Sequence, residues 1–227
     1  FGTDFASQLK RGPYGNIHTI GDDLWYDIQQ QVTWDKMIGT VASLNMAGWG
    51  AQEDRDPLWE MLKNSRTLII ALIDTKTTDT GITNLETELR ERWIAIDNYR
   101  PHVTHAPAKN RHIAGIVLAI HPCLARYASI NKLTLDPRGW GRWTGTTLIG
   151  RKRKIAIIAT YGPTPNTNDK AKDSMWQNQI KQMDKIPLAE KENDPRYQYM
   201  ADLEKTIHKL IKNNFEIILV GDINIDH

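Results

Sequence analysis

Short runs of apolar residues, each followed by polar loop residues, recur along most of the chain. Three of these runs, at residues 38–44, 67–73 and 216–220, are mostly apolar and too short to be buried helices. Runs of this length are typical of strands inside a sheet. We therefore predict a strand at each of the three positions.

Other segments carry their apolar residues at helical spacing. Residues 197–212 place most of their apolar side chains on one helical face, and residues 83–93 follow the same spacing. A shorter helix is expected to open at Asp56–Pro57, with Asp56 as its cap, and to run to about residue 64. A further helix is predicted at about residues 169–185.

The middle of the chain is predicted to consist of consecutive strands. Their expected bounds are residues 93–99, 112–120, 128–135, 144–149 and 154–160, and the last two strands form a hairpin around residues 150–153. The expected bounds leave His102 and His105 on a loop between the first two strands. Because consecutive strands lack intervening helices, the pattern favours an α/β protein with mixed sheets over a plain doubly wound fold.

Composition limits the class of protein. The chain has 227 residues, of which 40% are hydrophobic and 25% charged, as in soluble globular proteins. Its one cysteine, Cys123, excludes an internal disulfide and is typical of a reducing compartment. No apolar run approaches the roughly 18 residues that span a membrane, so we expect no membrane partner. Residues 1–37 are polar and without a long periodic pattern, and we interpret them as an N-terminal linker or arm that precedes a domain at 38–227.

Polar side chains follow the predicted strands at four separate strand ends. They are Asn45, Asp74, Tyr161 and the pair Asp222 and Asn224. Taken singly, each has a simpler explanation as a turn residue, a cap or a tyrosine with a solvated hydroxyl. Their recurrence matters more, because strands of one layer bring their ends together, and carboxylate and amide oxygens suit a hard divalent cation or a phosphate.

Six motifs in this order resemble those of the endonuclease/exonuclease/phosphatase superfamily, whose fold is DNase I-like. They are Leu44–Trp49, Leu72–Lys76, Gly115–Leu118, Asp136 with Gly141–Arg142, Ile158–Pro163 and Ile218–Asn224. The most similar subgroup is the apurinic/apyrimidinic-type endonuclease domains of non-LTR (LINE-like) retrotransposons. The resemblance implies a four-layer α/β/β/α sandwich of two mixed sheets that is incomplete at the C-terminus.

The resemblance also implies roles for the residues at the strand ends. Asn45 and Asp74 would hold Mg²⁺, or Mn²⁺ in its place, against the scissile phosphate. Tyr161 would orient the phosphate, Asp222 would align or activate the attacking water, and Asn224 would bind phosphoryl oxygens. The implied reaction is metal-dependent nicking of DNA, with a reverse transcriptase domain in the same polypeptide and an intracellular location, which is the nucleus if the protein derives from a retrotransposon.

The chain departs from the family pattern in two ways. Asp74 stands where the family has Glu, which draws the carboxylate back by roughly 1.2 Å, and a misplacement of about 1 Å can reduce a rate about a hundredfold. The family's Ser-Asp and Asp-His motifs have no counterpart before His227. We therefore expect the 227-residue chain to be inactive by itself and its second sheet to expose unpaired edges. Two alternatives remain at this stage: another substrate of the same superfamily (RNA, an inositol phosphate or a sphingolipid), or a degenerate non-catalytic fragment.

Basic residues near the predicted loops favour a nucleic-acid substrate. The candidate contacts are Lys76, Arg142, Arg151 and Arg153, of which the last two belong to the predicted hairpin tip. Basic loops beside the site would neutralise phosphates and make binding dependent on salt. The alternative for the hairpin tip is a solvated turn.

Overall fold

The computed structural model describes residues 40–48, 52–64, 67–77, 79–94, 101–106, 115–151, 153–165, 174–192 and 194–224. The predicted arm at 1–37 lies outside this part of the chain. Most of the predicted strand at 93–99 and the first part of the predicted helix at 169–185 lie outside it as well.

The first sheet combines one parallel pair of strands with two antiparallel pairs. Among the described residues it has four strands in the order β1-β2-β4-β3. The bounds are Thr40–Asn45 for β1, Thr67–Ile73 for β2, His102–Ala106 for β3 and Ile116–Ile120 for β4. β1 and β2 are parallel and are joined by helix α3, Gln52–Asn64, whereas β4 runs antiparallel to both of its neighbours.

The second sheet is also mixed. Its four described strands follow the order β5-β6-β7-β8. The bounds are Ala128–Ser129 for β5, Trp143–Ile149 for β6, Lys154–Tyr161 for β7 and Glu216–Asp222 for β8. Only β7 and β8 are parallel, and the connection between them contains helices α6, Met175–Met183, and α7, Pro195–Lys212.

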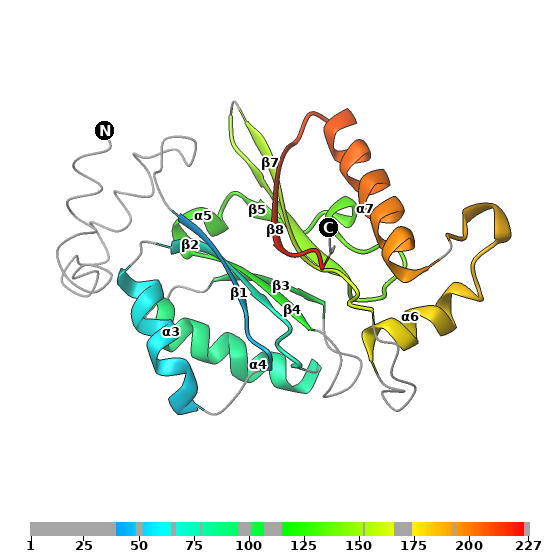
Figure 1. Cartoon of the computed structure of the whole chain (residues 1–227). Helices are drawn as coiled ribbons and strands as arrows, with labels where there is room; N and C mark the ends of the chain where they lie inside the picture. The colour runs from blue at the N-terminus through cyan, green and yellow to red at the C-terminus, as the bar shows by residue number, and fades with distance from the viewer. Residues whose placement is uncertain are drawn as a thin grey trace.

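The two sheets pack face to face, with helices on their outer faces (Figure 1). Helix α3 and helix α4, Asp79–Glu88, lie outside the first sheet, while α6 and α7 lie outside the second. Every residue of β2 and of β4 is buried, because these strands are central and covered on both faces. The arrangement confirms the predicted α/β fold of two mixed sheets in four layers.

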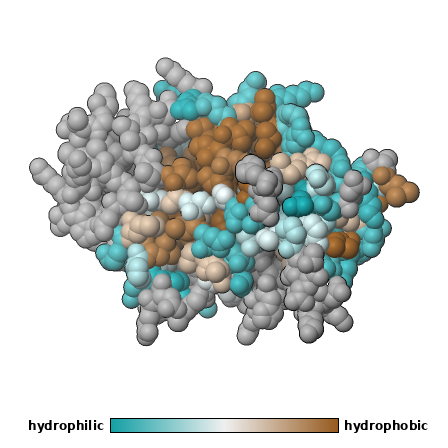
Figure 2. Space-filling model, viewed as in Figure 1, coloured by the Kyte–Doolittle hydropathy of each residue, from teal (hydrophilic) through white to brown (hydrophobic). Residues whose placement is uncertain are grey.

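The edge strand β8 leaves apolar surface exposed. Among the described strands only β7 pairs with β8, and the residues 217–220 in β8 are half-buried. Figure 2 shows a continuous apolar surface over β8 and the neighbouring β6–β7 hairpin, where Ile149 is 47% exposed. The exposed edge predicted for the second sheet is therefore present in the described part of the chain.

Several predicted bounds were right. β2 and β7 match the predicted strands closely, and the hairpin of β6 and β7 is confirmed. Helix α7 begins at Pro195, slightly before the predicted start, because the Asp194 side chain accepts hydrogen bonds from the N–H groups of Arg196 and Tyr197 and caps the helix there. No helix in the described residues is long and apolar enough to cross a bilayer.

The start of α3 was predicted wrongly. The helix begins at Gln52, so that Pro57 lies inside it and Asp56 is not its cap. Arg55, in the added turn, forms two hydrogen bonds with the Glu88 carboxylate, from Nε at 3.0 Å and from Nη2 at 2.8 Å. This contact with α4 holds the first turn of α3, and it could not be seen in the local sequence pattern.

Three of the predicted middle strands need correction. Trp93 begins no strand, because a π-helical turn, Leu89–Ile94, continues α4 and buries Trp93 completely. The strand β3 instead contains His102 and His105, which the sequence placed on a loop, and an edge strand tolerates such polar side chains. β4 begins at Ile116, and residues 112–114 lie outside the described residues. The strand expected at 128–135 ends at Ser129, because the Asn131 side chain caps a 3₁₀ turn.

Candidate active site

Two pairs of parallel strands place the predicted site residues at neighbouring ends. In the first sheet Asn45, the last residue of β1, lies opposite Ile73, and Asp74 follows directly. In the second sheet the register pairs Tyr161 with Asp222. These four residues therefore lie where β1, β2, β7 and β8 end.

A glycine allows the two sheets to approach each other at this end. Gly221 precedes Asp222 with a φ of +128°, a conformation that favours glycine. A Cβ atom there would lie 2.0 Å from the carbonyl oxygen of Thr160 and 2.8 Å from Cδ1 of Ile73 in the facing sheet. The missing side chain therefore brings β8 directly against the end of β2.

Carboxylates from both sheets influence the pKa of the Tyr161 hydroxyl. Burial raises the pKa of Tyr161 to about 12, and the negative charges of Asp74 and Asp222 add to the rise. A hydrogen bond with the Thr164 side chain acts in the opposite direction. The phenol therefore keeps its proton at neutral pH and can donate a hydrogen bond in the vicinity of two acidic residues.

Asp74 has a partly buried carboxylate on a strained backbone. Burial raises its pKa, and the nearby Lys76, whose Nζ lies 3.8 Å from Oδ2, partly offsets the rise. Its φ is +52°, and Lys76 has a φ of +53°, a left-handed conformation that few residues other than glycine adopt. Such strain is typical of functional sites.

Lys76 connects the loops that follow β1 and β2. Its Nζ donates a hydrogen bond to the carbonyl oxygen of Ala47 at 3.0 Å, and the Gly48 N–H donates to the Asp74 carbonyl at 2.7 Å. Asn45 is exposed, and its Oδ1 accepts a hydrogen bond from the Ala47 N–H at 3.1 Å. These contacts orient Asn45 and Asp74 on adjacent loops.

The end of β8 is held by contacts around Asp222 and Asn224. Asp222 Oδ1 accepts a hydrogen bond from the Asn224 N–H at 3.0 Å, and Asn224 Nδ2 donates to the Gly162 carbonyl at 2.9 Å. Gly162 must be small, because a Cβ there would lie 2.0 Å from the carbonyl oxygen of Ile223. A side-chain amide has two N–H donors, so Asn224 keeps one for a ligand.

The donor atoms at the ends of β1 and β2 fit a magnesium ion. Asn45 offers an amide oxygen and Asp74 a carboxylate, and Mg²⁺ in proteins takes one or two carboxylates and keeps several waters. No group of three or more His, Cys, Asp or Glu side chains in the described residues could hold a metal. The candidate donors therefore suit a cation that needs few protein ligands, and they do not suit zinc.

One of the predicted nucleic-acid contacts is buried beside the candidate site, and two lie away from it. The Arg142 side chain is 0% exposed and is paired with Asp136 and Asp202, so the prediction that it contacts nucleic acid is wrong. Arg151 and Arg153 precede β7, whereas Tyr161 is its last residue; at about 3.3 Å per residue, the seven steps from 154 to 161 separate the two ends by about 23 Å. Of the four, only Lys76 lies at the candidate site with an accessible side chain.

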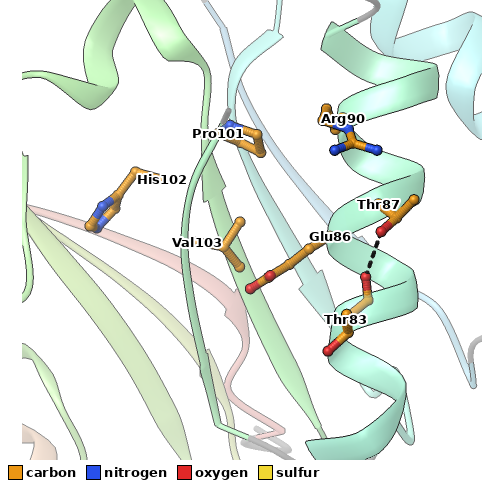
Figure 3. Close-up of a pocket in the computed structure, with 7 residues that line it drawn as sticks. All are labelled: Thr83, Glu86, Thr87, Arg90, Pro101, His102 and Val103. Carbon is orange, nitrogen blue, oxygen red and sulfur yellow. Dashed lines mark hydrogen bonds between the residues drawn. The ribbon is translucent and has the colours of Figure 1, made fainter. Parts of the chain in front are cut away.

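A pocket of about 370 Å³ between α4 and β3 contains none of the predicted site residues. Figure 3 shows Glu86 and Arg90 on the helix facing Val103 and Pro101. In the register of the sheet, His102 lies opposite Ile120, at the end of β4 away from the candidate site.

Cys123 and His121 form a buried pair that lacks the properties of a catalytic pair. The Cys123 Sγ lies 3.1 Å from the His121 Nδ1. Burial raises the pKa of the thiol to about 12 and lowers the pKa of the imidazole to about 3. Both groups are therefore neutral at physiological pH, and the thiol is not activated as a nucleophile.

No family model and no curated protein sequence matches the chain. Among solved structures, the AP endonuclease LMAP from Leishmania major aligns with a TM-score of 0.53 and 14% identity, over 86% of this chain and 59% of that one. The APE2 catalytic domain from Xenopus laevis aligns with a TM-score of 0.46 and 16% identity, over 82% of this chain and 59% of that one. TDP2 from C. elegans aligns with a TM-score of 0.49 and 10% identity, over 99% of this chain and 62% of that one. The chain thus spans less than two thirds of each of these structures, and the likeness to LMAP supports the fold described above.

Proposed function

We propose that the chain is part of a metal-dependent phosphodiesterase of the DNase I-like superfamily that nicks DNA. The observation that carries the proposal is the convergence of the strand ends: the register pairs Tyr161 with Asp222, and Gly221 brings β8 against Ile73, directly before Asp74. The fold shared with the AP endonuclease LMAP and the order of the six sequence motifs support the same reaction.

The side chains at the four strand ends have different roles in phosphodiester hydrolysis. Asn45 and Asp74 would hold Mg²⁺, or Mn²⁺ in its place, and the bound cation would supply positive charge to neutralise the scissile phosphate. Tyr161, protonated at neutral pH, donates a hydrogen bond to a phosphoryl oxygen. Asp222 orients the attacking water and accepts its proton, while the remaining N–H of Asn224 binds a second phosphoryl oxygen.

We further propose a retrotransposon type for the enzyme, with DNA as substrate and a reverse transcriptase domain in the same polypeptide. The six motifs taken together support this assignment, because the subgroup they most resemble is the endonuclease domains of non-LTR retrotransposons. A protein of this kind acts on chromosomal DNA and is therefore nuclear. Lys76, at the candidate site, is positioned to contact the DNA backbone near the scissile phosphate.

Nicking of supercoiled plasmid by the full polypeptide that carries this sequence tests the proposal. We expect open circles with Mg²⁺ and none in EDTA, because the metal offsets the charge that grows in the transition state. Residues 1–227 alone are expected to give no measurable nicking, because Asp226-His227 lies only three residues beyond Asn224 and does not replace the family's Asp-His motif for phosphate activation. If the full polypeptide leaves plasmid intact but hydrolyses RNA or an inositol phosphate, the DNA assignment is wrong.

A further inference from the structure

Arg142 is bound on several sides by buried acidic groups. Its Nε and Nη2 donate hydrogen bonds to the Asp136 carboxylate at 3.0 and 2.7 Å, and its Nη1 donates to Asp202 Oδ2 at 2.9 Å. Arg138 Nε donates to the same Asp202 oxygen at 2.6 Å. We call these four residues, Asp136, Arg138, Arg142 and Asp202, the arginine cluster.

Two tryptophans complete the surroundings of the Arg142 guanidinium. Its central carbon lies 4.7 Å from the ring centre of Trp140 and 4.7 Å from that of Trp143. A planar guanidinium can donate to two carboxylates and lie against aromatic rings at the same time, whereas an ammonium group cannot reproduce both contacts. The cluster therefore fixes the orientation of Arg142 as well as its charge.

The backbone of Arg142 is bound to the end of β7. Its carbonyl oxygen accepts hydrogen bonds from the Tyr161 N–H at 2.9 Å and from the Thr160 hydroxyl at 3.1 Å. The Thr160 hydroxyl also lies 2.7 Å from the Tyr199 hydroxyl, one turn before Asp202 on α7. The loop that ends at Arg142 and helix α7 therefore both form hydrogen bonds with the last two residues of β7.

We propose that Arg142 is a positioning residue for Tyr161, a role that rests on the proposed function. The cluster holds the loop that ends at Arg142 against α7, and the Arg142 carbonyl then holds the backbone of Tyr161. Its phenol is thereby held at the end of β7, beside the ends of β8 and β2. Replacing buried ion pairs by apolar residues of similar size is often neutral or stabilising, so stability alone gives no reason for burying the side chains of Asp136, Arg142 and Asp202 beside this tyrosine.

A double-mutant cycle separates positioning from a general structural role. We expect Arg142→Lys to lower kcat for plasmid nicking about tenfold with KM changed less than twofold, because a displacement of less than 1 Å at Tyr161 is enough. In a Tyr161→Phe background the same substitution should change kcat less than twofold, since the hydroxyl that it misplaces is already gone. Arg126→Lys is the matched control, because Arg126 is exposed and donates to the Tyr127 hydroxyl outside the arginine cluster; kcat should stay within twofold.

Carbon-13 NMR of residues 1–227 with labelled tyrosine rings gives a readout that does not need activity. Arg142→Lys should shift the Tyr161 resonance, assigned by its loss in Tyr161→Phe, and Arg126→Lys should leave it in place. If Arg142→Lys does not fold, Asp136→Asn, which removes one charge from the cluster, should give the same shift and the same loss of kcat.

An unmoved Tyr161 resonance, or an equal loss of kcat in both backgrounds, overturns the inference. If the full polypeptide nicks no DNA, the proposed function fails, while the resonance still decides the positioning of Tyr161.

Discussion

Replacing Asp222 with asparagine is expected to slow plasmid nicking by the full polypeptide about a thousandfold. An aspartate that accepts a proton from the attacking water typically contributes 10²- to 10⁴-fold to a rate, and the asparagine amide cannot accept that proton. The substitution keeps an oxygen that can accept the hydrogen bond from the Asn224 N–H. The fold should therefore persist, and the loss should appear in kcat.

The control for this substitution is Asp184→Asn. Asp184 is exposed and pairs with Lys191 at 3.0 Å on the surface, where an ion pair contributes little. Nicking should stay within twofold of the unchanged protein. If Asp222→Ala leaves nicking intact, Asp222 has no role in activating water.

Replacing Asp202 with alanine is expected to lower the free energy of unfolding by about 3–5 kcal/mol. Removing one partner of a buried ion pair leaves the other charge uncompensated, and here both Arg138 and Arg142 lose a carboxylate. For a domain of this size, the loss corresponds to a decrease in Tm of roughly 10–15 °C. Thermal and urea denaturation of residues 1–227 measure both quantities.

The stabilisation by Asp202 should also depend on pH. Burial favours the protonated carboxyl, but the hydrogen bonds and charges of Arg138 and Arg142 outweigh it and hold the pKa of Asp202 below its ordinary value of 3.8. A lowered pKa in the folded state means that the contribution is complete above the ordinary value and is lost as the pH falls through the folded one. The difference between the unchanged protein and Asp202→Ala should therefore shrink below about pH 4. A difference under 1 kcal/mol at pH 7 would show that the arginine cluster does not anchor α7.

The sequence was most informative where a single local pattern determines an element. β2 is apolar from Leu68 to Ile73 because both of its faces are covered, and α7 has a long apolar face and a strong cap. β3 was missed because an edge strand needs no apolar run. The π-helical turn at Leu89–Ile94 was missed because buried Trp93 suits a strand start as well as a helix face.

The same distinction holds for the residues of the candidate site: some of their positions follow from a local sequence pattern, and others do not. Residues at strand ends, such as Asp74 and Tyr161, could be predicted because the strands that carry them have clear patterns. The burial of Arg142 could not, because an arginine in a loop has the same local sequence whether it meets solvent or two carboxylates. The distance of Arg153 from the site follows from the direction of β7, which the composition of the hairpin tip does not reveal.

We propose one active site at the ends of β1, β2, β7 and β8, with its divalent metal at the ends of β1 and β2, and a manganese titration of residues 1–227 tests this most directly. Paramagnetic Mn²⁺ broadens the amide NMR signals nearest to it. We predict that the signals of Asn45 and Asp74 disappear first and those of Tyr161 and Asp222 next, whereas Lys154, about 23 Å along β7, keeps its signal longest. In Asp74→Ala this order should vanish. Broadening that begins at the β6–β7 hairpin, or that is unchanged in Asp74→Ala, would contradict the account.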